Sequence, residues 1–83
     1  MNIIQQIVNK KLNGITAAEL MKLSKDYQIT ITVEQAQQVT ALIKGQNINI
    51  YNSAERLELI KKIAKVTSPS TAQQVNMLLQ KLL

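Results

Sequence analysis

The chain is 83 residues long, with a formal net charge of +5 and neither cysteine nor histidine. This length predicts one domain, residues 1–83, with a core of modest size. The missing residue types exclude disulfides and thiolate metal sites, and they remove the side chain that most often serves as a general base or metal ligand.

The first predicted element is an amphipathic helix from Asn2 to Asn13. Polar side chains, among them Gln6 and Asn9, lie opposite an apolar face, which we expect to pack against the core. Gly14 is expected to end the helix in the left-handed conformation that glycine adopts without steric cost. The apolar face consists of Ile3, Ile4, Ile7, Val8 and Leu12.

The second helix is predicted to begin at Ala17 and to run to Asp26 or Tyr27. Thr16 and Glu19 have the spacing of a capping box, in which each side chain accepts a hydrogen bond from the other residue's backbone amide. The apolar members of this helix are Leu20, Met21, Leu23 and Tyr27.

Residues 29–32 are all β-branched and predict a short extended joint, which could bridge to Ile48 and Ile50. Thr32 then caps a third helix over 33–44, with Gln35 at the third helical position. Gly45 ends it. Its expected packing residues are Val33, Ala36, Val39, Leu42 and Ile43.

The longest run that does not predict a helix is the joint at 46–51. Ile48 and Ile50 alternate there with polar residues, so we expect an extended connector whose isoleucines face the core. Asparagines in such connectors usually serve turns and caps, which makes a ligand-binding role for them the weaker interpretation. Asn52 and Glu55 predict a capping box at the next helix.

Two further helices are predicted, from Ser53 to Val66 and from Pro69 to about Lys81. Ser68 is a favourable N-cap, and proline suits the first helical position because its missing amide hydrogen would be unpaired there anyway. Helix 53–66 is expected to be substantially buried through Leu57, Leu59, Ile60, Ile63, Ala64 and Val66. The stripe of the last helix is Ala72, Val75, Leu78, Leu79 and Leu82. The predicted fold class is therefore all-α, a small bundle of five short helices.

Two long stretches resemble a family of small uncharacterised proteins of Bacillus-type bacteria. They are MNIIQQIVNKKLNGITAAELMKLSKDYQITIT at the amino terminus and NINIYNSAERLELIKKIAKVTSPSTAQQVNMLLQKL from residue 47 onward. The resemblance covers most of the chain and includes no catalytic signature. It implies a small bacterial protein with a domain of unknown function, and it supplies no site residues.

The positive charge makes nucleic acid a possible partner. The passage from the second to the third helix has the outline of a helix-turn-helix, but its joint is long and the third helix opens with Val33 and Glu34 instead of base-reading side chains. Weak, sequence-independent contact with phosphates through Lys61, Lys62 and Lys65 is the alternative, although a solvated face explains the same lysines.

The function that we expect is that of a small, non-catalytic protein-interaction module. We predict no enzyme activity and no cofactor, and we expect a monomer or weak dimer with a protein partner. The beginning of the chain lacks the pattern of a secretion signal, and no apolar stretch reaches the roughly 20 residues of a membrane span, so a cytoplasmic location is expected. Candidate interface residues are Met77, Leu82 and Leu83.

Overall fold

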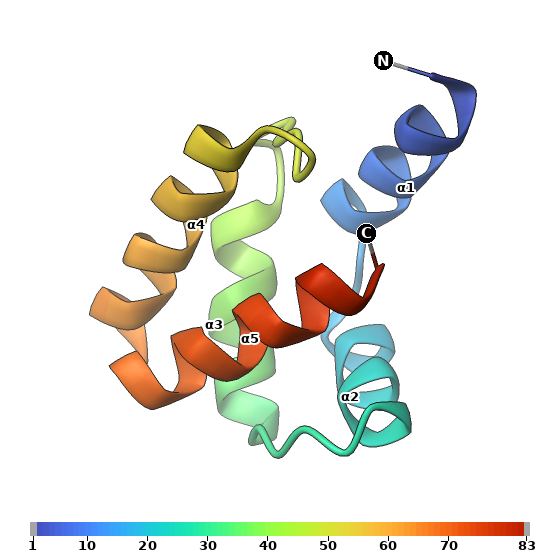
Figure 1. Ribbon diagram of the computed structural model, residues 1–83. Helices are drawn as coiled ribbons and strands as arrows, with labels where there is room; N and C mark the ends of the chain where they lie inside the picture. Colours follow the sequence, from blue (N-terminus) through green and yellow to red (C-terminus); the bar gives the residue numbers. More distant parts are fainter. Residues whose placement is uncertain (1, 83) are drawn as a thin grey trace.

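The computed structural model describes residues 2–82, and for Leu82 it describes the backbone only. Within this part of the chain there are five helices and no strand (Figure 1). The predicted all-α class is confirmed, and the predicted helix boundaries agree with the observed ones to within a residue or two. The helices are α1 (Ile3–Asn13), α2 (Ala17–Asp26), α3 (Val33–Ile43), α4 (Ser53–Val66) and α5 (Pro69–Leu82).

Each helix from α2 onward packs on the next one along the chain: α2 on α3, α3 on α4 and α4 on α5. A side-chain hydrogen bond of 3.0 Å from Gln35 Nε2 to Thr71 Oγ1 also ties the beginning of α3 to the beginning of α5. The first helix lies to one side of these four, at the upper right of Figure 1.

The core is aliphatic and draws on every helix and on both extended joints. Val39, Ile50 and Ile63 are completely shielded from solvent. The connector therefore contributes Ile50 to the centre of the core, as expected, while Ile48 is half-buried. The other buried apolar residues are Leu12, Leu20, Ile31, Ala36, Ile43, Leu59, Ala72, Val75, Leu78 and Leu79. The predicted stripe of α5 is thus confirmed for its first four members, while the side chain of Leu82 lies outside the described residues.

Several apolar residues that we expected to pack inward are exposed instead. Val33 is 57% exposed, Leu57 is 55% exposed and Val66 is 45% exposed. Val33 is the first residue of α3 and Val66 is the last residue of α4, whereas Leu57 lies within α4. The buried face of α4 is consequently narrower than predicted, with Leu59 and Ile63 at its centre.

The predicted caps of α2, α3 and α5 are confirmed. Thr16 and Thr32 form complete capping boxes with Glu19 and Gln35. The Ser68 hydroxyl accepts a hydrogen bond of 3.1 Å from the Thr71 amide at the start of α5. These caps fix the helix boundaries because they satisfy first-turn amides that have no partner within the helix.

The cap of α4 differs from the prediction. Asn52 accepts from the Glu55 amide at 3.0 Å, but the Glu55 carboxylate accepts from the Asn49 amide at 3.2 Å instead of from Asn52. The Asn52 amide is already donated to the Asn49 carbonyl. The reciprocal half of the capping box is therefore replaced by a contact that holds the connector.

The prediction for Gly14 was wrong, because its φ of −110° is not left-handed. Gly45 does adopt the left-handed conformation, with φ +76°. Gln28 and Asn47 also have positive φ, at 58° and 52°. At Gln28 this conformation lets the Ile29 amide donate a hydrogen bond to the Ser24 carbonyl at 2.7 Å, which ends α2.

The suggested bridge between residues 29–32 and the connector does not form, since neither segment is a strand.

Candidate functional site

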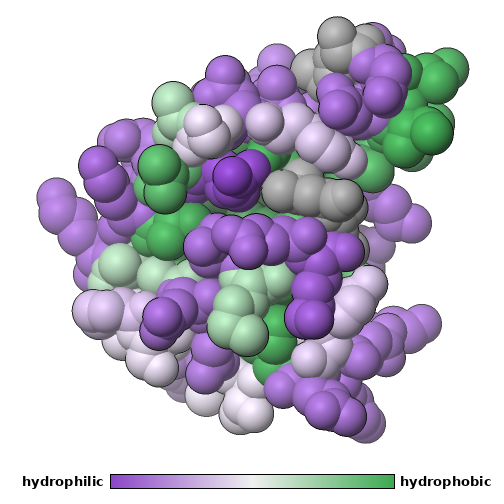
Figure 2. All heavy atoms as spheres, in the orientation of Figure 1, coloured by the Kyte–Doolittle hydropathy of each residue, from purple (hydrophilic) through white to green (hydrophobic). Residues whose placement is uncertain are grey.

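The first helix presents its most apolar residues to solvent and its asparagines to the rest of the protein. Ile3, Ile4 and Ile7 are 71%, 67% and 60% exposed, whereas Asn9 and Leu12 are 8% and 5% exposed. In Figure 2 strongly apolar atoms accordingly gather at the upper right of the molecule, over α1. Our prediction that the isoleucine face packs against the core was therefore wrong. We call Ile3, Ile4 and Ile7 the α1 ridge.

Two asparagines explain this orientation because they hold α1 to the connector. Asn13 Nδ2 donates to the Ile48 carbonyl at 2.8 Å, and the Ile48 amide donates to Asn13 Oδ1 at 2.7 Å. Asn9 Oδ1 accepts from the Ile50 amide at 3.0 Å, and its Nδ2 donates to Asn49 Oδ1 at 2.8 Å. These bonds satisfy backbone groups of a connector that has no strand partner.

The other side of the connector is held by the start of α4. Arg56 donates from its guanidinium to the Ile50 carbonyl at 2.8 Å. Asn49 Oδ1 also accepts from the Tyr51 amide at 3.1 Å. The side chains of Asn9, Asn13 and Asn49 are thus occupied by internal hydrogen bonds, in agreement with the structural role favoured by the sequence.

An apolar groove lies beside the α1 ridge, between α1 and α2. Its volume is about 490 Å³, and we call it the α1/α2 groove. Val8, Leu12, Ile15 and Leu23 are its apolar lining, and Ile7 belongs both to the groove and to the ridge. The charged residues that line it are Lys11, Glu19, Lys22 and Asp26. Ridge and groove together form a continuous apolar surface with a charged border.

One of these charged residues, Glu19, has a lowered pKa. The main cause is the hydrogen bond from the Thr16 backbone amide, at 3.1 Å, and the next is the bond from the Thr16 hydroxyl, at 3.0 Å. Lys11 adds a weaker electrostatic attraction. The two hydrogen bonds and the attraction to Lys11 all stabilise the charged carboxylate, so Glu19 is ionised at neutral pH.

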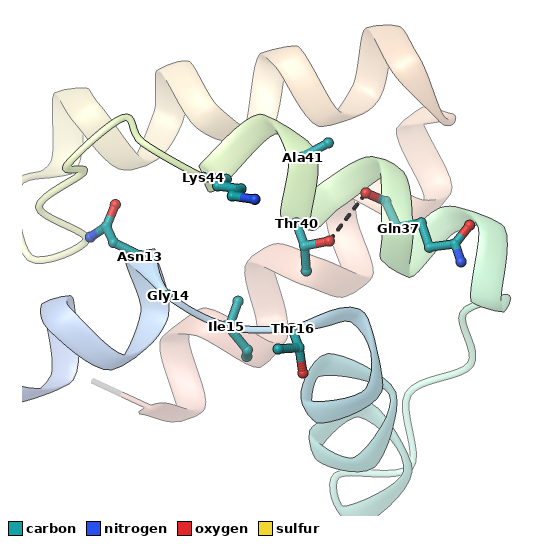
Figure 3. Close-up of a pocket in the computed structure, with 8 residues that line it drawn as sticks. All are labelled: Asn13, Gly14, Ile15, Thr16, Gln37, Thr40, Ala41 and Lys44. Atoms are coloured by element: carbon teal, nitrogen blue, oxygen red, sulfur yellow. Dashed lines mark hydrogen bonds between the residues drawn. The ribbon is translucent and has the colours of Figure 1, made fainter.

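A second hollow, of about 440 Å³, lies between the α1–α2 joint and the second half of α3 (Figure 3). Two of its polar side chains are engaged in hydrogen bonds: the Thr40 hydroxyl donates to the Ala36 and Gln37 carbonyls at 3.0 and 3.1 Å, and the Asn13 amide is bound to Ile48. Lys44 is the charged residue of its lining.

The lysines considered for nucleic-acid contact, Lys61, Lys62 and Lys65, are exposed on α4. Glu58 lies three residues before Lys61 and four before Lys62, so a negative charge shares this face. Arg56 cannot extend the cluster while it is bound to the Ile50 carbonyl.

Of the interface residues suggested by the sequence, Met77 is 51% exposed on α5. Leu83 and the side chain of Leu82 lie outside the described residues. Within residues 2–82, no three acidic side chains gather in a way that could hold a metal ion. None of the helices in the same range is long and apolar enough to cross a bilayer.

Comparison with known proteins places the chain in a family. All of residues 1–83 match the model described as "Protein of unknown function (DUF2624)". The chain belongs to the DUF2624 family. It is also 45% identical over 76 residues to the uncharacterised protein YqfT of Bacillus subtilis (strain 168), which covers 92% of this chain and 90% of YqfT. The resemblance to small uncharacterised bacterial proteins is thereby confirmed. No solved structure matches this member of the DUF2624 family.

The exposure of the α1 ridge was not predicted from the sequence, because its residues have the spacing of a core-facing stripe. One signal does point to the observed orientation. Asn9 and Asn13 are one helical turn apart on the opposite face, and the connector that they bind has no other strand to satisfy its backbone.

Proposed function

We propose that this protein is a small, non-catalytic protein-interaction module that binds its partner through the α1 ridge and the α1/α2 groove. The observation that supports it most directly is the outward orientation of Ile3, Ile4 and Ile7, each at least 60% exposed. Exposed apolar surface of this kind is costly in a small domain with little core to spare, and in soluble proteins it commonly marks an interface.

The form of the surface also supports binding to a protein. A groove of about 490 Å³ with an apolar lining and charged edges suits an apolar side chain from a partner, while the edges fix its orientation. We propose the cytoplasm as the location of this activity.

The alternative is weak, sequence-independent binding of nucleic acid by Lys61, Lys62 and Lys65. The net charge of +5 supports it. Glu58 on the same face weakens it, and so does the engagement of Arg56 with the connector. Charge reversal of the three lysines tests this alternative: duplex binding measured by fluorescence anisotropy should fall steeply with added salt and be lost in the variant if phosphates are contacted.

The main proposal is tested by affinity capture from a bacterial extract with a carboxy-terminal tag, with and without nuclease. The test variant is Ile4→Gln/Ile7→Gln, and the matched control is Val33→Gln/Leu57→Gln, whose residues are 57% and 55% exposed on other helices. Wild type and control should retain the same proteins after nuclease treatment, and the test variant should lose them. Retention of those proteins by Ile4→Gln/Ile7→Gln, with wild-type helicity, would contradict the proposal.

A further inference from the structure

The α1 ridge and the α1/α2 groove lie side by side and share Ile7. The ridge is convex and the groove is concave, and both are apolar. A surface with a projection next to a matching recess can bind a second copy of itself about a two-fold axis, because each ridge then enters the groove of the other molecule.

The charges at the groove agree with such self-association. Lys11 and Lys22 balance Glu19 and Asp26, so these charged residues are neutral overall although the chain carries +5. The groove thus has two of the five acidic residues of the whole chain. The α1 helix itself contains Lys10 and Lys11 and no acidic residue. In a two-fold dimer, the basic helix of one copy would meet the acidic residues at the groove of the other.

We infer that the occupant of the α1/α2 groove is the α1 ridge of a second copy of this chain, in a two-fold symmetric dimer. The inference rests on the proposed function, since it names the partner of the same surface. Ile7 lies nearest the symmetry axis, because it alone belongs to both the ridge and the groove. Lys10 and Lys11 face Glu19 and Asp26 across the interface.

The area available also favours a reciprocal contact. A stable interface buries about 800 Å² per partner, roughly one seventh of the 5447 Å² that this chain exposes. Three isoleucine side chains alone fall short of that area. In the two-fold arrangement each copy buries its ridge and its groove together, so the contact is larger than one made by a single ridge.

The experiment is sedimentation velocity on the purified full chain at concentrations from about 10 μM to about 1 mM, the range in which weak complexes form. It compares wild type with Ile7→Lys and with the control Leu57→Lys, residues that are 60% and 55% exposed. Wild type and Leu57→Lys should form dimers with the same dissociation constant. Ile7→Lys should weaken dimerisation at least about tenfold, with unchanged helicity by circular dichroism.

Three results would overturn the inference. They are a wild-type chain that stays monomeric at all concentrations, a dimer that Ile7→Lys does not weaken, and an assembly whose mass rises with concentration beyond that of two copies. Failure here is distinguishable from failure of the proposed function. A monomeric wild type whose captured proteins are still lost in Ile4→Gln/Ile7→Gln rejects the second copy but keeps the interaction surface. If the wild type stays monomeric and Ile4→Gln/Ile7→Gln captures the same proteins as the wild type, both the dimer and the proposed interaction surface are rejected.

Discussion

The side chain of Asn13 forms two hydrogen bonds with the backbone of Ile48, a residue 35 positions away in sequence. It donates to the carbonyl at 2.8 Å and accepts from the amide at 2.7 Å, as a neighbouring strand would. One asparagine thus joins the first helix to the connector, and the isoleucines on the opposite side of that helix are left facing solvent.

The first prediction concerns this pair. Asn13→Ala leaves both backbone groups of Ile48 without their partner in a half-buried position, so we expect a loss of about 2 to 4 kcal/mol in the free energy of unfolding. Gln38→Ala, on the exposed side of α3, is the control and should change stability by less than about 0.5 kcal/mol. The two variants are compared by their midpoints of unfolding in urea. Equal midpoints for Asn13→Ala and Gln38→Ala would show that Asn13 does not hold the connector.

The second prediction concerns pH. Because the folded-state pKa of Glu19 lies below its unfolded value, Glu19 contributes stability above the unfolded pKa, and this contribution is lost as the pH falls through the lower folded pKa. Thr16→Ala removes the hydroxyl donor and keeps the backbone amide, so the pKa of Glu19 should rise part of the way to its ordinary value. An NMR titration of the Glu19 carboxyl measures this, and an identical pKa in both proteins would contradict the assignment.

The third prediction concerns the end of α2. Gln28 has φ 58°, a conformation that is unfavourable for a residue with a Cβ and free of that strain for glycine. Gln28→Gly should therefore raise the free energy of unfolding by about 0.5 to 1 kcal/mol. Gly45→Ala is the converse change at φ +76° and should lower it. Thermal or urea unfolding measures the stability of both variants. A destabilised Gln28→Gly variant would mean that contacts of the Gln28 side chain stabilise the protein by more than the backbone strain costs.

The fourth prediction separates core from surface on α5. Leu79 is 2% exposed and Met77, two residues earlier, is 51% exposed. Leu79→Ala should cost about 2 to 5 kcal/mol of unfolding free energy, a large share of the stability of a small domain. Met77→Ala should change it by less than about 0.5 kcal/mol. Comparable unfolding midpoints for the two variants would be incompatible with the observed packing of α5.

The sequence predicts the helices of this protein well because their boundaries depend on local chemistry. Thr16, Thr32 and Ser68 cap helices by contacts with residues three positions away, so the relevant partners lie within a few residues of each other. The same is true of Pro69, whose ring fixes the start of α5.

The orientation of α1 was not predictable in this way. Hydrophobic periodicity identifies an apolar face but does not say whether that face meets the core. The deciding contacts, from Asn9 to Ile50 and from Asn13 to Ile48, join residues more than 30 positions apart. The exposure of Val33, Leu57 and Val66 likewise does not follow from periodicity, because burial depends on tertiary packing.

The central claim is that the isoleucine face of α1 points to solvent while Leu12 points inward. The absence of native cysteine makes thiol labelling a direct test, because Ile7→Cys and Leu12→Cys each introduce the sole reactive thiol of the chain. In dilute native protein, Ile7→Cys should react nearly as fast as in denaturant, and Leu12→Cys should react at least about 100-fold more slowly because it requires opening of the structure. An Ile7→Cys thiol as protected as that of Leu12→Cys would contradict the account.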